Sequence, residues 1–331
     1  MFKPKNNSQP KLMKSNMTRL QSKILLISTL FFMGIVMLSC SQESSEETET
    51  GMIGENEMDE ALTWDSIQDS TDTITSIDGF SGPEAVRYDS AQDVYFVANF
   101  NGNPVGDANG FISRVSPKGS FDSLRFMTGT ENNPLHGPRG MFITGDTLWA
   151  ADAEGVHGFN KNTGEHAAFI DFTSFEPEFL NDIVEGADGN LYVTDTGKST
   201  VYIIENGTPS VLVEDLPAPP NGITIDADNN LVLAPWEGAT MFPVLAEGDP
   251  GYEGYAEAQS GGNFDGIEFI NGRMIVASQN DNSIHFIYEG NDHVAIRTPG
   301  DPADIGIDTQ RNRVAVPYIA LNRVDIWQLP E

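Results

Sequence analysis

The sequence has a single cysteine, few basic residues and only one extended apolar run, which is 15 residues long. One cysteine excludes a disulfide framework and a cysteine-based zinc site. The 18 lysines and arginines stand against 49 acidic residues, so the formal net charge is -31. Because phosphate backbones and anionic membrane surfaces repel such a chain, this charge excludes nucleic-acid binding and electrostatic membrane binding.

The rest of the composition is that of a folded protein with many turns. Hydrophobic residues make up 39% of the chain, including 19 Phe, 8 Tyr and 4 Trp, which is ample for a packed core. The 32 glycines and 19 prolines favour an all-β protein over a helical one.

The first 40 residues have the pattern of an export signal. They hold six basic residues and no acid, and residues 24–38 form the apolar run. A membrane-spanning helix needs about 20 residues, so a shorter run favours a secretory signal. The run leads into Met37-Leu38-Ser39-Cys40, which resembles a bacterial lipobox, where the cysteine is lipidated after cleavage. The alternative is an uncleaved anchor helix with an incidental cysteine.

Residues 41–63 are predicted to be a disordered acidic tether. Eight acids lie between Glu43 and Glu60, and the segment has too few apolar residues to form a core. It either resembles the surface-export signal of some Gram-negative lipoproteins or is a plain spacer. The expected protein is therefore exported and held in the outer membrane through the lipid on Cys40, on the periplasmic or the cell-surface side.

From residue 82 onward, a unit of about 40 residues recurs six times. Each unit opens with a short segment, and apolar strand-like segments separated by Asp, Asn and Gly turns follow it. The second residues of the openings lie at positions 84, 139, 181, 221, 265 and 303. Four short strands in a unit of this length are typical of a β-propeller blade. The sequence therefore predicts an all-β, six-bladed β-propeller with four-stranded blades over residues 64–331.

The last unit shows only three strands before position 331. We expect the N-terminal segment around residues 69–77 to add the fourth strand of this blade. That strand would close the ring and remove its free sheet edges.

The innermost strand of each propeller blade starts near the central axis, so the six openings bring their side chains together there. The second positions are, in order, Glu84, Arg139, Asn181, Asn221, Asp265 and Ala303. The third positions are small except for Asp182 and Asp304. Two carboxylates and two amides at one point are an all-oxygen ligand set, which suits Ca²⁺ rather than zinc or copper.

These openings and the hairpins behind them resemble the gluconolactonase and senescence-marker-protein (regucalcin) family over about residues 80–331. The same superfamily of calcium-dependent six-bladed propellers includes diisopropylfluorophosphatase and the paraoxonases. The most specific segments are Pro220-Asn221-Gly222-Ile223, Asn181-Asp182 and Asp265-Gly266-Ile267. The resemblance implies that Glu84, Asn181, Asn221 and Asp265 hold one catalytic calcium. It also implies that Asp265 helps to deliver or activate the nucleophile.

Arg139 departs from this family pattern, and two interpretations are open. Its guanidinium could clamp an anionic substrate or developing negative charge, which would make Arg139 catalytic. It could instead form a salt bridge with Glu84 or Asp265 where the metal would bind.

Paraoxonases use a histidine pair as the base, whereas here only His136 lies near an opening, and a structural or exposed role is expected for it.

The resulting prediction is a monomeric, metal-dependent hydrolase of lactones or related esters that acts on a small molecule. The alternative is a non-catalytic ligand-binding or sensor propeller whose axial site is plugged by Arg139, and a scaffold for partner proteins is a third possibility. The sequence contains neither GxSxG nor HExxH, which argues against serine hydrolases and zincins. Trp236 follows the Asn221 opening closely and could line the pocket.

Overall fold

The computed structural model describes residues 72–103, 106–244, 256–288 and 291–330, and these ranges form six four-stranded antiparallel sheets. The chain divides into two units, residues 1–58 and 59–331, and every described residue belongs to the second. The predicted signal peptide, lipidated Cys40 and acidic tether lie outside the described residues. Within the described ranges, no helix has the length and apolar character that a membrane crossing requires.

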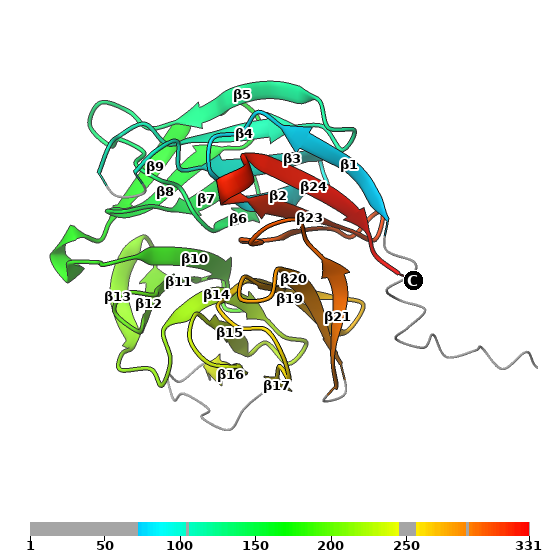
Figure 1. Cartoon of the computed structure of the whole chain (residues 1–331). Helices are drawn as coiled ribbons and strands as arrows, with labels where there is room; N and C mark the ends of the chain where they lie inside the picture. Colours follow the sequence, from blue (N-terminus) through cyan, green and yellow to red (C-terminus); the bar gives the residue numbers. More distant parts are fainter. Residues whose placement is uncertain (1–71, 104–105, 245–255, 289–290, 331) are drawn as a thin grey trace, which may run out of the picture. The chain divides into compact units, whose positions relative to one another are not determined.

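Each of the first three blades runs outward through four consecutive strands (Figure 1). The strands of blade 1 are β2 (Pro83–Asp89), β3 (Val94–Asn99), β4 (Phe111–Val115) and β5 (Phe121–Thr128). Those of blade 2 are β6 (Met141–Thr144), β7 (Thr147–Ala151), β8 (Gly155–Asn160) and β9 (His166–Asp171). Those of blade 3 are β10 (Leu180–Glu185), β11 (Leu191–Asp195), β12 (Thr200–Glu205) and β13 (Thr208–Val213). A short 3₁₀ helix, η1 (Thr173–Phe175), connects blades 2 and 3.

Blades 4 and 5 repeat the pattern. The strands of blade 4 are β14 (Pro220–Ile225), β15 (Leu231–Pro235), β16 (Thr240–Val244) and the two-residue β17 (Ala256–Glu257). Those of blade 5 are β18 (Phe264–Ile270), β19 (Arg273–Ser278), β20 (Ser283–Tyr288) and β21 (Asn291–Arg297).

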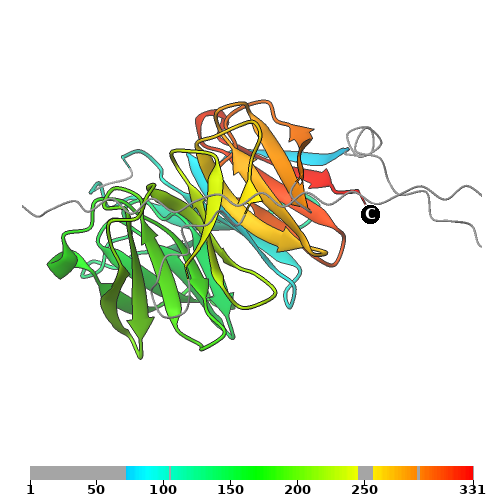
Figure 2. The ribbon, with the colours of Figure 1, turned by 90° about the horizontal axis from the view of Figure 1, so that it is seen from below.

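Blade 6 combines the two ends of the described chain, as the sequence predicts. It consists of β22 (Gly306–Asp308), β23 (Arg313–Tyr318), β24 (Arg323–Gln328) and β1 (Thr73–Asp78), and η2 (Ile319–Leu321) precedes β24. The N-terminal β1 pairs antiparallel with β24, and the two strands lie side by side in both views (Figure 1, Figure 2). The innermost strands β2, β6, β10, β14, β18 and β22 contact one another in a closed circle. The predicted six-bladed propeller is therefore confirmed.

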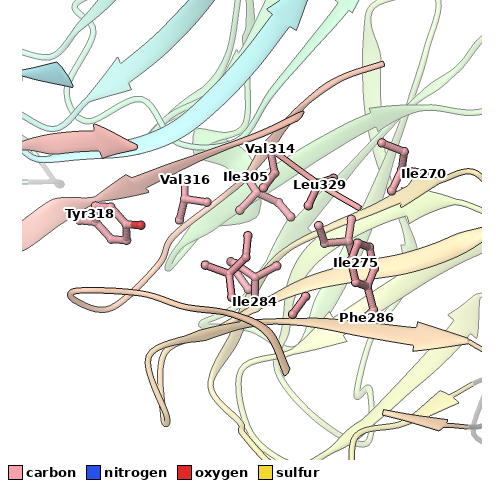
Figure 3. Packing of buried hydrophobic residues seen from close by; sticks show 12 residues of the cluster. Ile270, Ile275, Ile284, Phe286, Ile305, Val314, Val316, Tyr318 and Leu329 are labelled. Atoms are coloured by element: carbon pink, nitrogen blue, oxygen red, sulfur yellow. The ribbon is translucent and has the colours of Figure 1, made fainter. Parts of the chain in front are cut away.

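The burial of each strand follows from its place in the blade. The second strand of blade 1, β3, is buried at all six positions because neighbouring blades cover both of its faces. The outer strand β5 is mostly exposed or half-buried, because it lies at the rim. Between adjacent blades, apolar side chains interlock; Figure 3 shows the cluster in which Ile284 and Phe286 of blade 5 meet Val314 and Val316 of blade 6. Such packing fixes where each innermost strand begins, and so positions the axial side chains.

Candidate functional site

The structure brings the four predicted calcium ligands together. Glu84, Asn181, Asn221 and Asp265 all line one cavity of about 500 Å³. Each is the second residue of an innermost strand, and each is at most 5% exposed. Residues at equivalent positions of the repeat therefore lie around one cavity in the structure.

A shared backbone irregularity accompanies these four side chains. In each of the four strands, the pairing with the next strand shifts register at or beside the candidate ligand. The shifts lie between Pro83 and Ala85, Leu180 and Ile183, Pro220 and Ile223, and Phe264 and Ile267. A β-bulge re-aims a side chain beside a functional site, so these irregularities direct polar residues to the axis from otherwise apolar strands.

The donors of the two amides are used within the protein. Asn181 Nδ2 donates to Thr196 Oγ1 at 3.1 Å, and Asn221 Nδ2 donates to the Phe264 carbonyl at 2.8 Å. The buried atoms Asn221 Oδ1 and Glu84 Oε2 have no hydrogen-bond partner. A buried acceptor without a partner is costly, so both oxygens are suited to a cation or to a ligand donor.

The two carboxylates are buried close to each other without a direct ion pair. None of the ion pairs among the described residues involves Glu84 or Asp265. Burial, followed by the charge of Asp182, raises the pKa of Asp265 to about 7, although hydrogen bonds from Gln279 and Asn221 lower it. Burial and the charge of Asp265 also raise the pKa of Glu84 well above its usual value, although the charges of Arg139 and Arg87 lower it. A bound divalent cation would lower both pKa values by favouring the ionised carboxylates.

The donor set fits a hard cation. The described residues include no group of three or more His, Cys, Asp or Glu side chains in a metal-binding arrangement. The axial set instead combines two carboxylates with two amide oxygens, which Ca²⁺ accepts together with water, and zinc does not favour.

Arg139 lies behind the wall of this cavity. Its side chain is completely buried, Nη1 donates to the Leu180 carbonyl at 2.9 Å, and it is not among the residues that line the cavity. The guanidinium carbon lies 3.9 Å from the ring centroid of Phe179 and 5.8 Å from that of Phe100. Both phenylalanines line the cavity, so Arg139 backs two of its aromatic walls. Its roles as an anion clamp or as a plug for the site stay predictions.

A second charged layer, further along the same strands, was not predicted in full. Arg87 Nη2 lies 3.2 Å from Asp304 Oδ2 and 3.8 Å from Asp182 Oδ1. Arg87 also hydrogen bonds to Glu268 and to the Met141 carbonyl. Arg87 and Glu268 each lie three residues after a candidate ligand, Glu84 and Asp265. This layer could have been predicted from the sequence, because both charged residues occupy the same position in strands that are otherwise apolar.

The histidines lie away from the axial cavity. His136 is buried, and its Nδ1 accepts a hydrogen bond from the Ala108 amide at 3.0 Å. In blade 5, His285 Nδ1 lies 2.6 Å from Asp292 Oδ1, and Nε2 lies 2.7 Å from Ser283 Oγ. This network has the residue types of a hydrolase triad, but Ser283 and His285 are both 0% exposed and Ser283 Oγ donates to Asp281 Oδ1. A nucleophile must be reached by its substrate, so the network is structural.

Enzymes of known structure share the fold. A streptogramin B lyase matches with a TM-score of 0.58 and 15% identity, over 80% of this chain and 99% of the lyase. A virginiamycin B lyase from Staphylococcus aureus matches with a TM-score of 0.53 and 14% identity, over 79% and 100% of the two chains. A gluconolactonase from Xanthomonas campestris matches with a TM-score of 0.56 and 14% identity, over 78% and 89%. No family model matches the sequence, and no curated protein is significantly similar to it. The gluconolactonase resemblance is thus confirmed at the level of the fold.

Proposed function

We propose that the protein is a calcium-dependent hydrolase of lactones or related esters. Glu84, Asn181, Asn221 and Asp265 would hold the ion. The observation that carries the proposal is the pair of buried, unpartnered oxygens, Glu84 Oε2 and Asn221 Oδ1, in a set with two carboxylates and no direct ion pair. The gluconolactonase among the structures with this fold supports the choice of reaction.

The bound ion would supply Lewis-acid polarisation of the substrate carbonyl. The residues of the chain would do the remaining work. Gln279 Nε2 donates to Asp265 Oδ2 at 2.7 Å and fixes the orientation of that carboxylate. Asp265 would then orient the attacking water by accepting a hydrogen bond from it.

Calcium binding is tested by thermal unfolding of the full chain, first in chelator and then in millimolar Ca²⁺. A site of micromolar affinity at a thousandfold excess of ligand adds about 4 kcal/mol, so the wild-type Tm should rise by several degrees. The Asp265→Asn variant should lose most of this rise, because it removes one of the two carboxylates. Asp228→Asn, in an exposed hairpin, is the matched control and should keep the rise. A Ca²⁺ effect that is absent in the wild type, or equal in Asp265→Asn, would overturn the metal site.

The proposed anchor has its own test. We propose that the protein is exported and held in the outer membrane, as a monomer, through lipid on Cys40. Cys40→Ser should abolish labelling by an alkyne-tagged fatty acid and move the protein from the membrane fraction to the soluble fraction. Ser39→Ala keeps a small residue before the cysteine and should be labelled normally. Retention of Cys40→Ser in the membrane fraction would favour the uncleaved anchor helix.

A further inference from the structure

We infer that the substrates are lactones or esters with an alkyl or aryl body rather than polyhydroxylated sugar lactones. This inference rests on the proposed function and specifies the chemistry of the same cavity.

The walls of the cavity are apolar on several sides. Phe100, Phe179, Pro219, Trp236 and Ile319 line it, and they come from blades 1, 3, 4 and 6. Four of them remain partly exposed, and Phe100 is 9% exposed. Apolar side chains around a concave polar floor are typical of a site that buries an apolar ligand.

Two polar side chains of the same cavity outside the proposed ligand set, Thr196 and Gln279, are already engaged within the protein. Thr196 Oγ1 donates to the Pro220 carbonyl at 2.7 Å and accepts from Asn181 Nδ2. The Gln279 amide donates to Asp265. A sugar lactone carries several hydroxyl groups, and Glu237 at the exposed edge of the cavity could replace the hydrogen bonds to water of only some of them.

The aromatic walls are held in place from behind. Arg139 lies over the Phe179 ring at 3.9 Å and is anchored by its hydrogen bond to the Leu180 carbonyl. A cation stacked on an aromatic ring fixes the orientation of that ring. Arg139 is therefore a positioning residue for the apolar wall, and the cavity is ordered before the substrate binds.

The test compares δ-nonalactone, δ-valerolactone and glucono-δ-lactone as substrates of the calcium-loaded full chain, with acid release followed by pH-stat. The four additional methylenes of δ-nonalactone should raise kcat/KM by about tenfold or more over δ-valerolactone. Glucono-δ-lactone should be the poorest substrate. Trp236→Ala should lower the ratio of kcat/KM for δ-nonalactone to that for δ-valerolactone by about fivefold, because it removes part of the wall. Tyr288→Ala, which replaces an exposed aromatic on blade 5, should leave the ratio unchanged.

The inference is overturned if glucono-δ-lactone is hydrolysed as efficiently as δ-nonalactone, or if Trp236→Ala does not change the ratio. If no lactone is hydrolysed, the proposed function fails, and calorimetric titration with δ-nonalactone and glucono-δ-lactone decides the ligand class. Preferential binding of δ-nonalactone would support an apolar ligand, and equal or absent binding would overturn it.

Discussion

Arg87→Met is expected to destabilise the folded domain by about 3–5 kcal/mol, because it leaves buried carboxylates without their countercharge. Arg87 is 13% exposed at its side chain, and its partners Asp182 and Asp304 are each 3% exposed. Burial lowers the pKa of Arg87, but Asp304, Glu268 and Asp182 together raise it above its usual value. The guanidinium is thus the local charge that keeps three acids of different blades close to the axis.

Chemical denaturation of the full chain, at pH 7 in chelator, measures this effect separately from calcium binding. Arg114→Met is the control, because Arg114 forms a more exposed ion pair with Asp122 at 3.5 Å and should cost less than about 1 kcal/mol. Should Arg87→Met fail to fold, adding Glu268→Gln and Asp304→Asn should restore folding by removing the uncompensated charges. A cost of Arg87→Met equal to that of Arg114→Met, or no rescue by the two neutral substitutions, would contradict this account.

The phase of the repeat explains why so much of the axial site could be predicted. Glu84, Asn181, Asn221 and Asp265 occupy the same position of their units, and a propeller places equivalent positions around one axis. The closing strand was predictable for a related reason, since a blade of three strands leaves an edge that β1 covers.

Contacts that depend on side-chain direction were harder to predict. The repeat brings Arg139 to the axis, but its side chain stacks on Phe179 and donates to the Leu180 carbonyl, and the charges of Glu84, Asp152 and Asp195 act on the guanidinium. The ion pair of Arg87 with Glu268 links blades 1 and 5, which have blade 6 between them in the ring. A single sequence does not show how strands so far apart in the chain are aligned. The β-bulges that direct the candidate ligands to the axis cannot be recognised in the repeat pattern either.

The buried hydrogen bonds of His285 with Ser283 and Asp292 in blade 5 lead to the second prediction of a large loss of stability, and this loss depends on pH. His285→Phe should cost about 3 kcal/mol at pH 7, because Phe replaces the ring but leaves the buried Asp292 Oδ1 without its partner and removes one of the hydrogen bonds of Ser283. The Asp292 side chain is 1% exposed. His166→Phe, at a half-buried position of blade 2, is the control and should cost about 1 kcal/mol or less.

The sign of the pH dependence follows from Asp292. Burial raises its pKa, but the hydrogen bond and charge of His285, with the amides of Ser260 and Gln259, outweigh burial and lower the pKa below its usual value. A carboxyl with a lowered native pKa stabilises the fold above its unfolded-state pKa, and this stabilisation is lost as the pH falls through the native pKa. The titratable and charged groups around the network, Asp281, His293 and Arg297, remain in the variant. The difference in unfolding free energy between wild type and His285→Phe should therefore be largest near pH 7 and shrink toward pH 3. A difference that stays constant over this range would show that His285 contributes by packing alone and that its bond to Asp292 adds nothing to stability.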